Sequence, residues 1–264
     1  MIRLFVSGAS GNVGRLVVRE AILRRDVELA GGFCLEGEQD LGVLAGTDPL
    51  GLAAVSDLRV GLAASSPDVV VDFTSAVVLR DHLELYAELG LDAVVGTTGL
   101  PEEEIRRVRD RVRDRGLRLA LISNFGLGIN LVMDFLAAVG EHYPYVSVLE
   151  RHPASMANAP SGTAGLLASS VPGGSSGEVA SREVLPGVLG GNAFGVPVLS
   201  QRMPYPGPYS EHEVTLGRQD EILRISVTDF SSSVYLEGIF RAVRGVGALP
   251  PGTLVRRLGE FPKE

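Results

Sequence analysis

The chain has 264 residues, 45% of them hydrophobic, and a formal net charge of −8 at pH 7. This composition allows a sizeable core and argues against disorder, while the acidic balance argues against a nucleic-acid or anionic-membrane partner. The single cysteine, Cys34, excludes an intrachain disulfide and a cysteine-based metal cluster, and without a recognisable signal peptide or long apolar run the protein is expected to be soluble and cytoplasmic.

The first half of the sequence alternates between strand and helix patterns. Strands are expected at residues 2–6, 27–33, 69–73, 93–96 and 119–123, and helices at 12–24, 79–89 and 101–115. Repeated β–α–β spacing with right-handed crossovers predicts an α/β fold built on a doubly wound parallel sheet.

A glycine-rich turn joins the first expected strand to the first helix. Gly8 allows a tight turn, Gly11 lets the backbone approach a pyrophosphate, and Gly14 allows close helix–strand packing. The N–H groups of Asn12 and Val13 then lie at the positive end of a helix. The pattern predicts a Rossmann-like dinucleotide site, and a tight βα turn that binds nothing is the alternative.

Three further loops, 72–75, 96–99 and 123–126, follow expected strands. Because ligands of open α/β sheets bind at the carboxyl edge, these loops are predicted to frame a nicotinamide ring. Ordinary βα turns made of small residues are the alternative.

The residue that binds the ribose hydroxyls is expected at the end of the second strand. Cys34 occupies about that position, where it is also typical of a small core side chain, and Glu36 follows two residues later. We see no Arg nearby in the sequence to meet a 2′-phosphate. Glu36 favours NADH weakly, and NADPH stays open.

The second half of the chain changes character and is rich in Gly, Pro and Ser turns. Strands are expected at 146–150, 179–184, 193–199, 212–216 and 221–227, and helices at 131–143, 162–170 and 234–243. This pattern predicts an α+β domain with a mostly antiparallel or mixed sheet, followed by a helix that returns to the first domain.

Two features of the second half carry chemistry. Ser161, Gly162 and Thr163 open a helix, where backbone N–H groups and two hydroxyls offer a carboxylate cradle; a plain N-cap is an equal alternative. His152 is a candidate proton donor or anion ligand, although a structural histidine is the more frequent role of a lone His. The only lysine is Lys263, so a lysine general acid inside a cleft is almost excluded.

The sequence resembles the dihydrodipicolinate reductase family, also called 4-hydroxy-tetrahydrodipicolinate reductases, over most of its length. The motifs that carry the resemblance are the turn at 8–14 and residues 71–74, 95–99, 124–130, 150–152, 159–164 and 211–214. The blocks at 96–99 and 159–164 are specific to this family rather than to nucleotide-binding folds in general.

The resemblance implies a two-domain subunit in a homotetramer. The dinucleotide-binding domain would comprise residues 1–127 plus 235–264, and the inserted α+β domain for substrate binding and tetramerisation residues 128–234. It further implies hydride transfer from NADH or NADPH to a cyclic conjugated imine dicarboxylate of the lysine and diaminopimelate pathway.

The resemblance also assigns roles by position, and no metal is expected. By this resemblance Gly8, Gly11, Val13 and Gly14 would hold the pyrophosphate, and Gly96, Thr98, Asn124 and Phe125 would flank the nicotinamide. The positions of Asn12, Cys34, Glu36, Phe73 and Thr74 in the same loops add them to the expected cofactor residues. Ser161, Gly162 and Thr163 would hold a substrate carboxylate, and His152 is the active-site histidine.

Departures from the family pattern fall in the active site. Pro153, Met156 and Asn158 stand where the family has a second His, a Lys and an Asp. The missing Lys is the expected proton donor, and loss of a general acid typically costs about 10²–10⁴-fold in rate.

Further along the chain, a loop at 202–209 is richer in Pro and Tyr, including Tyr205 and Tyr209, and Val227 and Ser231 replace basic residues of the family. Several anion-binding groups are therefore lost, which favours a less charged substrate than a dianion.

Three functions remain open from the sequence. The first is a reductase of an imine or a conjugated C=C/C=N bond, with a changed substrate as in specialised metabolism. The second is a scaffold recruited for a non-redox lyase or cyclase step. The third is a binding protein that senses a dinucleotide.

Overall fold

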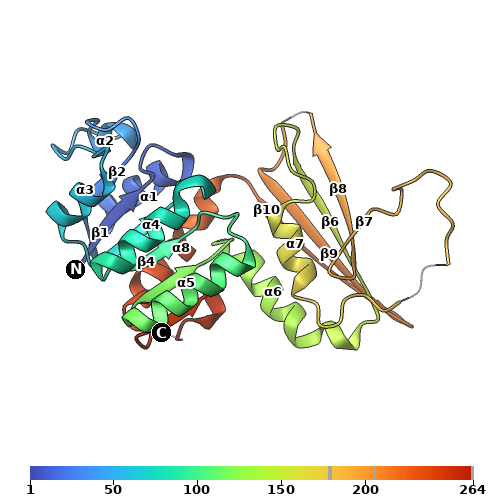
Figure 1. Ribbon diagram of the computed structural model, residues 1–264. Coiled ribbons are helices and arrows are strands. Elements are labelled where there is room, and N and C mark those ends of the chain that lie inside the picture. The colour runs from blue at the N-terminus through green and yellow to red at the C-terminus, as the bar shows by residue number, and fades with distance from the viewer. Residues whose placement is uncertain (178–179, 205, 263–264) are drawn as a thin grey trace. The chain divides into compact units, whose positions relative to one another are not determined.

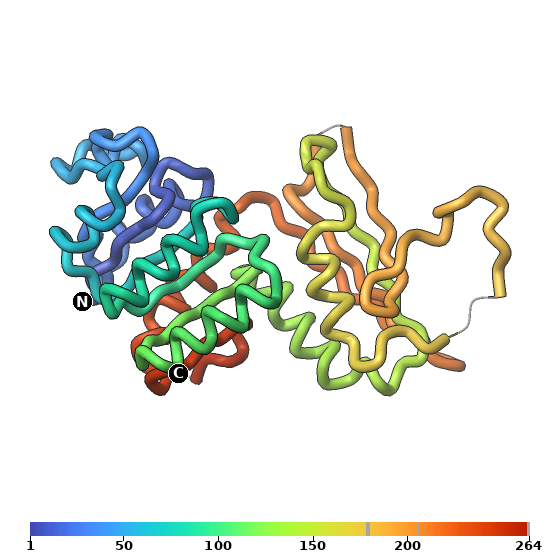
Figure 2. The backbone as a smooth tube through the Cα atoms, in the orientation of Figure 1, coloured from blue at the N-terminus to red at the C-terminus, as the bar shows by residue number. Residues whose placement is uncertain are grey.

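The structure of the protein, a computed structural model, describes residues 1–177, 180–204 and 206–262. It divides into two compact units, one formed by Met1–Phe125 with Tyr235–Glu264 and the other by Gly126–Val234. Figure 2 shows the blue N-terminal part and the red C-terminal part of the chain in the same unit. The second unit is thus an insertion between β5 and α8 of the first.

The first unit is built on a six-stranded sheet in the order β11-β5-β4-β3-β1-β2, in which the paired strands are parallel (Figure 1). Its strands are β1 Ile2–Ser7, β2 Val27–Phe33, β3 Val69–Asp72, β4 Asp92–Val95, β5 Arg118–Leu121 and β11 Thr253–Val255. Its helices are α1 Asn12–Leu23, α2 Leu41–Leu44, α3 Leu58–Ser65, α4 Ala76–Leu89, α5 Glu102–Arg115 and α8 Leu236–Val246, followed by a short 3₁₀ turn at Leu258–Glu260.

Strand β1 is the point at which the chain changes direction across this sheet. β2 pairs with one side of β1, and the chain then crosses to form β3 on the other side. Ligands of open α/β sheets bind at such a switch point, outside the carboxyl ends of the strands. The Rossmann-like doubly wound sheet expected from the sequence is therefore confirmed.

Local sequence explains most of these elements. The four residues of β3 are all buried, as expected for a parallel strand covered on both faces. Helix α5 begins with Glu102, Glu103 and Glu104 and ends with Arg115 before Gly116, so its charges complement the helix dipole at both ends. The sequence interpretation missed α2, α3 and β11, since elements of three to eight residues give little periodic signal.

The second unit carries a five-stranded mixed sheet in the order β10-β9-β6-β8-β7. Its strands are β6 Tyr145–Pro153, β7 Gly191–Ala193, β8 Val196–Met203, β9 Ser210–Arg218 and β10 Glu221–Asp229. Helices α6 Leu127–Val139 and α7 Gly162–Ser169 share one core cluster with the sheet (Figure 1). β6 pairs in parallel with β8 and antiparallel with β9, so the expected mixed α+β domain is confirmed.

Two strand expectations in this unit were wrong. Residues 180–184 form no strand, and Val179 lies outside the described residues. The carboxylate of Glu183 instead accepts the N–H groups of Gly187 and Leu189 and shapes an irregular loop. The expected strand 193–199 is divided by a turn, because Phe194 and Gly195 have φ values of 53° and 79°.

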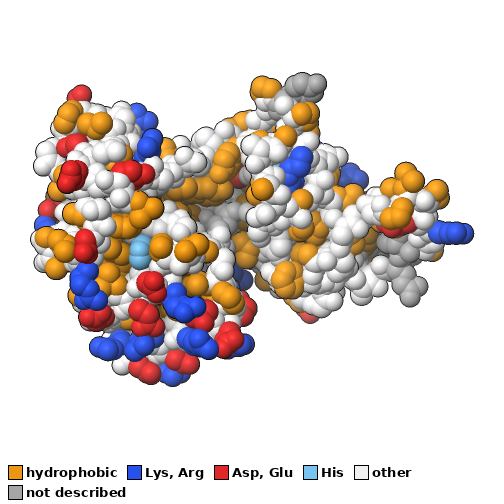
Figure 3. All heavy atoms as spheres, turned by 45° about the horizontal axis from the view of Figure 1, so that its top comes forward, with side chains coloured by type: hydrophobic (Ala, Val, Ile, Leu, Met, Phe, Trp, Pro, Cys, Tyr) orange, Lys and Arg blue, Asp and Glu red, His pale blue; other side chains and the backbone are white. Residues whose placement is uncertain are grey.

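Acidic and basic side chains are interspersed on the face of the first unit seen in Figure 3. Exposed ion pairs of this unit include Arg107 with Glu103 (2.6 Å) and Arg59 with Glu88 (2.6 Å). None of the described helices has the length and apolarity needed to cross a bilayer.

Candidate active site

The glycine turn after β1 leaves no room for side chains. Gly8 has φ +87°, and a Cβ there would lie 2.6 Å from the carbonyl oxygen of Phe73. A Cβ on Gly14 would lie 2.0 Å from the carbonyl oxygen of Gly8. The N-cap of α1 is Gly11, which has no capping side chain, so the N–H groups of Asn12–Gly14 are available at the helix end. Backbone donors at a positive helix end form a pyrophosphate site.

The side chain of Phe73 brings together three of the predicted cofactor segments. A Cβ on Gly96 would lie 2.0 Å from the Phe73 ring, so the two loops touch only because residue 96 is glycine. The Phe73 ring also packs on Phe125, with ring centroids 5.7 Å apart at 55°. The loops after β1, β3, β4 and β5 therefore meet at one edge of the sheet.

The structure separates two neighbouring threonines of the loop after β4. Thr98, predicted as a cofactor residue, is exposed, whereas Thr97 is 8% exposed and donates a hydrogen bond to Asp72. Asn124, the residue before Phe125, is buried. Asp72, a carboxylate at the end of an apolar strand, was missed as a site residue. The available signal was a charged residue at the end of a strand that was expected to be buried. Such a charge needs hydrogen-bond partners, because an unpaired charge is not tolerated inside a sheet.

The end of β2 offers one exposed carboxylate beside the glycine turn. Ser10 donates a hydrogen bond to Glu36 (3.1 Å), and hydrogen bonds from the Glu36 backbone and from Ser10 lower the pKa of this carboxyl. Cys34 is buried, and burial raises the pKa of its thiol. Arg15 of α1 is close enough to act on Glu36 electrostatically, so the expectation that no Arg lies near this position was wrong.

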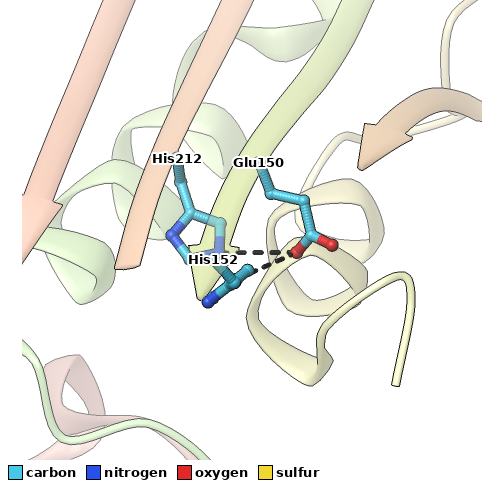
Figure 4. Close-up of side chains that lie close together, drawn as sticks. All are labelled: Glu150, His152 and His212. Atoms are coloured by element: carbon cyan, nitrogen blue, oxygen red, sulfur yellow. Dashed lines mark ion pairs between the residues drawn. The ribbon is translucent and has the colours of Figure 1, made fainter. Parts of the chain in front are cut away.

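A second cluster lies in the other unit, on neighbouring strands. Alternation along β6 places Glu150 and His152 on its buried face, and His212 of β9 is the cross-strand partner of Glu150. Figure 4 shows the two imidazole rings beside the Glu150 carboxylate. The Nε2 atoms of His152 and His212 lie 3.2 Å and 3.8 Å from Glu150 Oε2.

Glu150 is fully buried and its carboxylate is heavily hydrogen-bonded. The backbone N–H of Ser161 donates to both oxygens (3.1 Å each), and Ser200 (2.7 Å) and Arg202 (3.2 Å) donate to Oε1. Burial raises the pKa of this carboxyl, but these hydrogen bonds outweigh burial and lower it to about 2. Glu150 is therefore an anion at neutral pH.

The two histidines differ in their surroundings. Burial, together with the neighbouring His152, lowers the pKa of His212 to about 4, so this ring is neutral at pH 7. His212 Nε2 lies 3.3 Å from the Ser161 hydroxyl. His152 Nε2 lies beside the Glu150 anion without the alignment of a hydrogen bond. The His152 ring thus lies next to a buried carboxylate.

The start of α7 lies against this cluster. The Ser161 hydroxyl accepts the N–H of Ala164 (3.1 Å), so Ser161 acts as the N-cap and its side chain is buried. Gly162, the first helical residue, is exposed, and Thr163 is half-buried. Glu150 therefore holds the first turn of α7 by hydrogen bonds and lies beside His152.

The cluster also has the composition of a metal site, since single ligand atoms of Glu150, His152 and His212 lie within 4.8 Å of one another. The Glu150 carboxylate is, however, already neutralised by Arg202 and hydrogen-bonded by Ser161 and Ser200. This donor set favours proton handling over binding of a cation. The sequence predicted His152 and Ser161 but assigned no role to Glu150, His212, Ser200 and Arg202. Of these four residues, Glu150 and His212 are buried.

Two family models match the chain. The model described as "Dihydrodipicolinate reductase, N-terminus" matches residues 2–125, and "Dihydrodipicolinate reductase, C-terminus" matches residues 128–256. The chain is 32% identical over 254 residues to the 4-hydroxy-tetrahydrodipicolinate reductase of Desulfitobacterium hafniense, covering 94% of each protein. It is 32% identical over 270 residues to that of Methanothermobacter thermautotrophicus, covering 97% of each.

Solved structures show the same fold. Dipicolinate-bound dihydrodipicolinate reductase from Paenisporosarcina sp. TG-14 matches with a TM-score of 0.82 at 23% identity, over 98% of both chains. An amine dehydrogenase from Mycobacterium smegmatis matches with a TM-score of 0.67 at 17% identity, over 99% of this chain and 96% of that one.

Proposed function

Since the chain belongs to the dihydrodipicolinate reductase family, and is an NAD(P)H-dependent oxidoreductase, we propose that it reduces a conjugated cyclic imine carrying a single carboxylate. The observation that carries the proposal is one buried anion, Glu150, which accepts the N–H at the start of α7 and lies 3.2 Å from His152 Nε2. A proton donor and a carboxylate-binding helix end thereby lie on either side of the same carboxylate.

A nicotinamide dinucleotide fits the first unit. The turn at 8–14 supplies backbone donors for the pyrophosphate, and the Phe73–Gly96 contact shapes the edge where the ring would lie. Thr74, Thr98, Asn124 and Phe125 complete the proposed cofactor residues. When bound, the reduced cofactor supplies a hydride.

His152 supplies the proton in this proposal. Reduction of a C=C or C=N bond adds a hydride to one atom and a proton to its partner. His152 donates that proton, and the Glu150 carboxylate at 3.2 Å stabilises the protonated imidazole before transfer. The first turn of α7, with Gly162 and Thr163, orients the substrate carboxylate by preorganised donors.

The residues that replace the family's basic groups support a substrate with less negative charge. Met156 is half-buried in the turn after β6, and its N–H donates to the carbonyl of Pro153 (3.0 Å). Val227 packs in the core of its unit, where a Cβ on Gly128 would lie 3.2 Å from it. Lys263 and Tyr205 lie outside the described residues. A second carboxylate would therefore lose charge-assisted contacts, each worth about 1.5–3 kcal/mol.

Met156→Lys tests the substrate charge. We expect the wild type to oxidise reduced cofactor at 340 nm with a cyclic imine monocarboxylate, and more slowly with enzymatically generated hydroxy-tetrahydrodipicolinate. Met156→Lys is expected to raise kcat/KM for the dicarboxylate about 10-fold or more, because it restores one ion pair. Met156→Leu, which adds no charge, is the control.

Two results would contradict the proposal. If the wild type turned over the dicarboxylate faster than the monocarboxylate, its substrate would be the ordinary substrate of the family. Tight cofactor binding without oxidation by any cyclic imine would favour the non-redox or dinucleotide-sensing functions instead. By family resemblance, the proposal extends to a homotetramer formed through the second unit. The departures from the family pattern, such as Met156, extend it to a role in specialised metabolism.

Glu36→Ala tests cofactor choice. We expect the wild type to prefer NADH, because the ionised carboxylate at the end of β2 accepts ribose hydroxyls and repels a 2′-phosphate. The variant is expected to raise KM for NADH about 10-fold while KM for NADPH stays equal or falls. Glu38→Ala, on the same loop, is the control. A wild type that prefers NADPH, with Arg15 as the phosphate ligand, would refute this assignment.

A further inference from the structure

Asp72 is the last residue of β3, and its side chain has no exposed surface. Five hydrogen-bonding groups surround its carboxylate. They are the N–H and hydroxyl of Thr74 (3.0 and 2.7 Å), the hydroxyl of Thr97 (3.0 Å), the hydroxyl of Tyr86 (2.6 Å) and Nδ1 of His82 (3.0 Å). A buried anion is tolerated only with such complete pairing.

The two oxygens of Asp72 serve different parts of the unit. Oδ1 accepts from Thr74 and Thr97, which lie in the loops after β3 and β4. Oδ2 accepts from Tyr86 and contacts His82, both on α4. Oδ1 therefore holds the loops after β3 and β4, and helix α4 holds Oδ2.

The groups on α4 fix the carboxylate in place. Tyr86 is 2% exposed, and burial beside Asp72 raises the pKa of its hydroxyl well above the usual range, so it remains a donor. The His82 ring meets Phe33, at the end of β2, edge to face with centroids 5.6 Å apart. The pKa of Asp72 is lowered, because hydrogen bonds from His82, Tyr86 and Thr74 outweigh burial. The Asp72 carboxylate is thus ionised at neutral pH.

The loops held by Oδ1 are those assigned above to the cofactor. Thr74 follows Phe73, and Thr97 lies between Gly96 and Thr98. Phe73 in turn closes on Gly96 and Phe125, with no space for a Cβ at position 96. The Asp72 side chain itself has no exposed surface.

We propose that Asp72 is a positioning residue for hydride transfer, which sets the loops after β3 and β4 through Thr74 and Thr97 while α4 holds it through Tyr86 and His82. This inference rests on the cofactor site of the proposed function. Displacement of a bound reactant by about 1 Å can cost about 10²-fold in rate. A small movement of the two loops that Asp72 holds is therefore expected to lower the rate strongly.

Thr97→Val and Tyr86→Phe form a matched pair for the test. Each removes one hydroxyl donor from the same carboxylate with little change in shape, one on the loop side and one on the helix side. We expect Thr97→Val to weaken NADH binding, followed by cofactor fluorescence, and to lower kcat about 10-fold or more, with KM for the imine within about 3-fold.

Tyr86→Phe is expected to give the opposite pattern. Cofactor Kd and kcat should stay within about 3-fold of the wild type, because His82 Nδ1 still contacts Oδ2 at 3.0 Å and keeps the carboxylate in place. The Tm should fall by about 2–4 °C because a buried hydrogen bond is lost. Asp72→Asn should combine both effects, and adding Thr97→Val to it should lower kcat little further.

Equal effects of Thr97→Val and Tyr86→Phe on cofactor Kd and kcat would overturn the inference. They would show that the Asp72 carboxylate stabilises the fold and has no separate role in positioning the cofactor loops. The proposed function can fail separately, if the wild type binds NADH but oxidises none of it with cyclic imines. In that case the fluorescence comparison of the two variants still decides whether Asp72 positions the cofactor loops.

Discussion

His152→Gln is expected to lower kcat for the cyclic imine about 10²–10⁴-fold, the usual contribution of a general acid. The loss should be this large because Met156 replaces the family lysine, and Arg202 does not release a proton near neutral pH. The measurement is steady-state oxidation of NADH at 340 nm, with cofactor Kd determined separately to show that the first unit is unaffected.

His212→Gln is the matched control, because its ring packs on His152 with centroids 5.1 Å apart. The lowered pKa of about 4 keeps His212 neutral at pH 7, so it has no proton to supply there as an imidazolium. The amide of Gln can replace the contact of Nε2 with Ser161. We expect less than about 10-fold loss of kcat. Equal losses in the two variants would exclude His152 as the specific proton donor.

The parts of the fold that the sequence predicted are those encoded by neighbouring residues. The spacing of Gly8, Gly11 and Gly14 is a local requirement of one turn, and the structure shows that side chains at Gly8 and Gly14 would collide with backbone. The α/β alternation likewise follows from local periodicity. The strand expected at 179–184 was wrong for residues 180–184, because a few β-branched and polar residues in a short segment do not distinguish a strand from a loop, here one held by Glu183.

The candidate site was only partly predictable, because its contacts join strands far apart in the sequence. Glu150 meets His212 through the β6–β9 register, and Ser200 through the β6–β8 register. Neither register can be read from local spacing. The different surroundings of Thr97 and Thr98 were equally hard to predict, since one residue along an extended segment reverses the side on which a side chain lies. Asp72 and Glu150 were recognised as important residues only when the structure showed that their carboxylates are buried.

Glu150→Gln is expected to destabilise the second unit by about 3–5 kcal/mol at pH 7, the usual cost of breaking a buried ion pair. The substitution leaves Arg202 without its anion, and it places an amide N–H₂ among donors from Ser161 and Ser200. Hydrogen exchange of peptides from β6 and β9 reports on this unit separately from the first.

Glu211→Gln is the control for the loss of one carboxylate charge. Glu211 pairs with Arg151 at 2.5 Å, but both side chains are partly exposed, at 23% and 29%. Partly exposed pairs contribute at most about 1 kcal/mol, so hydrogen exchange should change little. A loss in Glu211→Gln as large as that in Glu150→Gln would show that burial of the carboxylate is not the cause.

Acid should remove the difference between the wild type and Glu150→Gln. The folded pKa of about 2 lies below the ordinary value of 4.5, so the carboxylate stabilises the folded state fully above pH 4.5 and progressively less as pH falls towards 2. That shift corresponds to about 3 kcal/mol. The difference in free energy of unfolding between the wild type and Glu150→Gln should therefore be constant between pH 6 and 8 and become smaller below pH 4.5. A difference that persisted at pH 2 would mean that the amide disrupts packing, and that the charge of Glu150 does not hold His152 and α7 together.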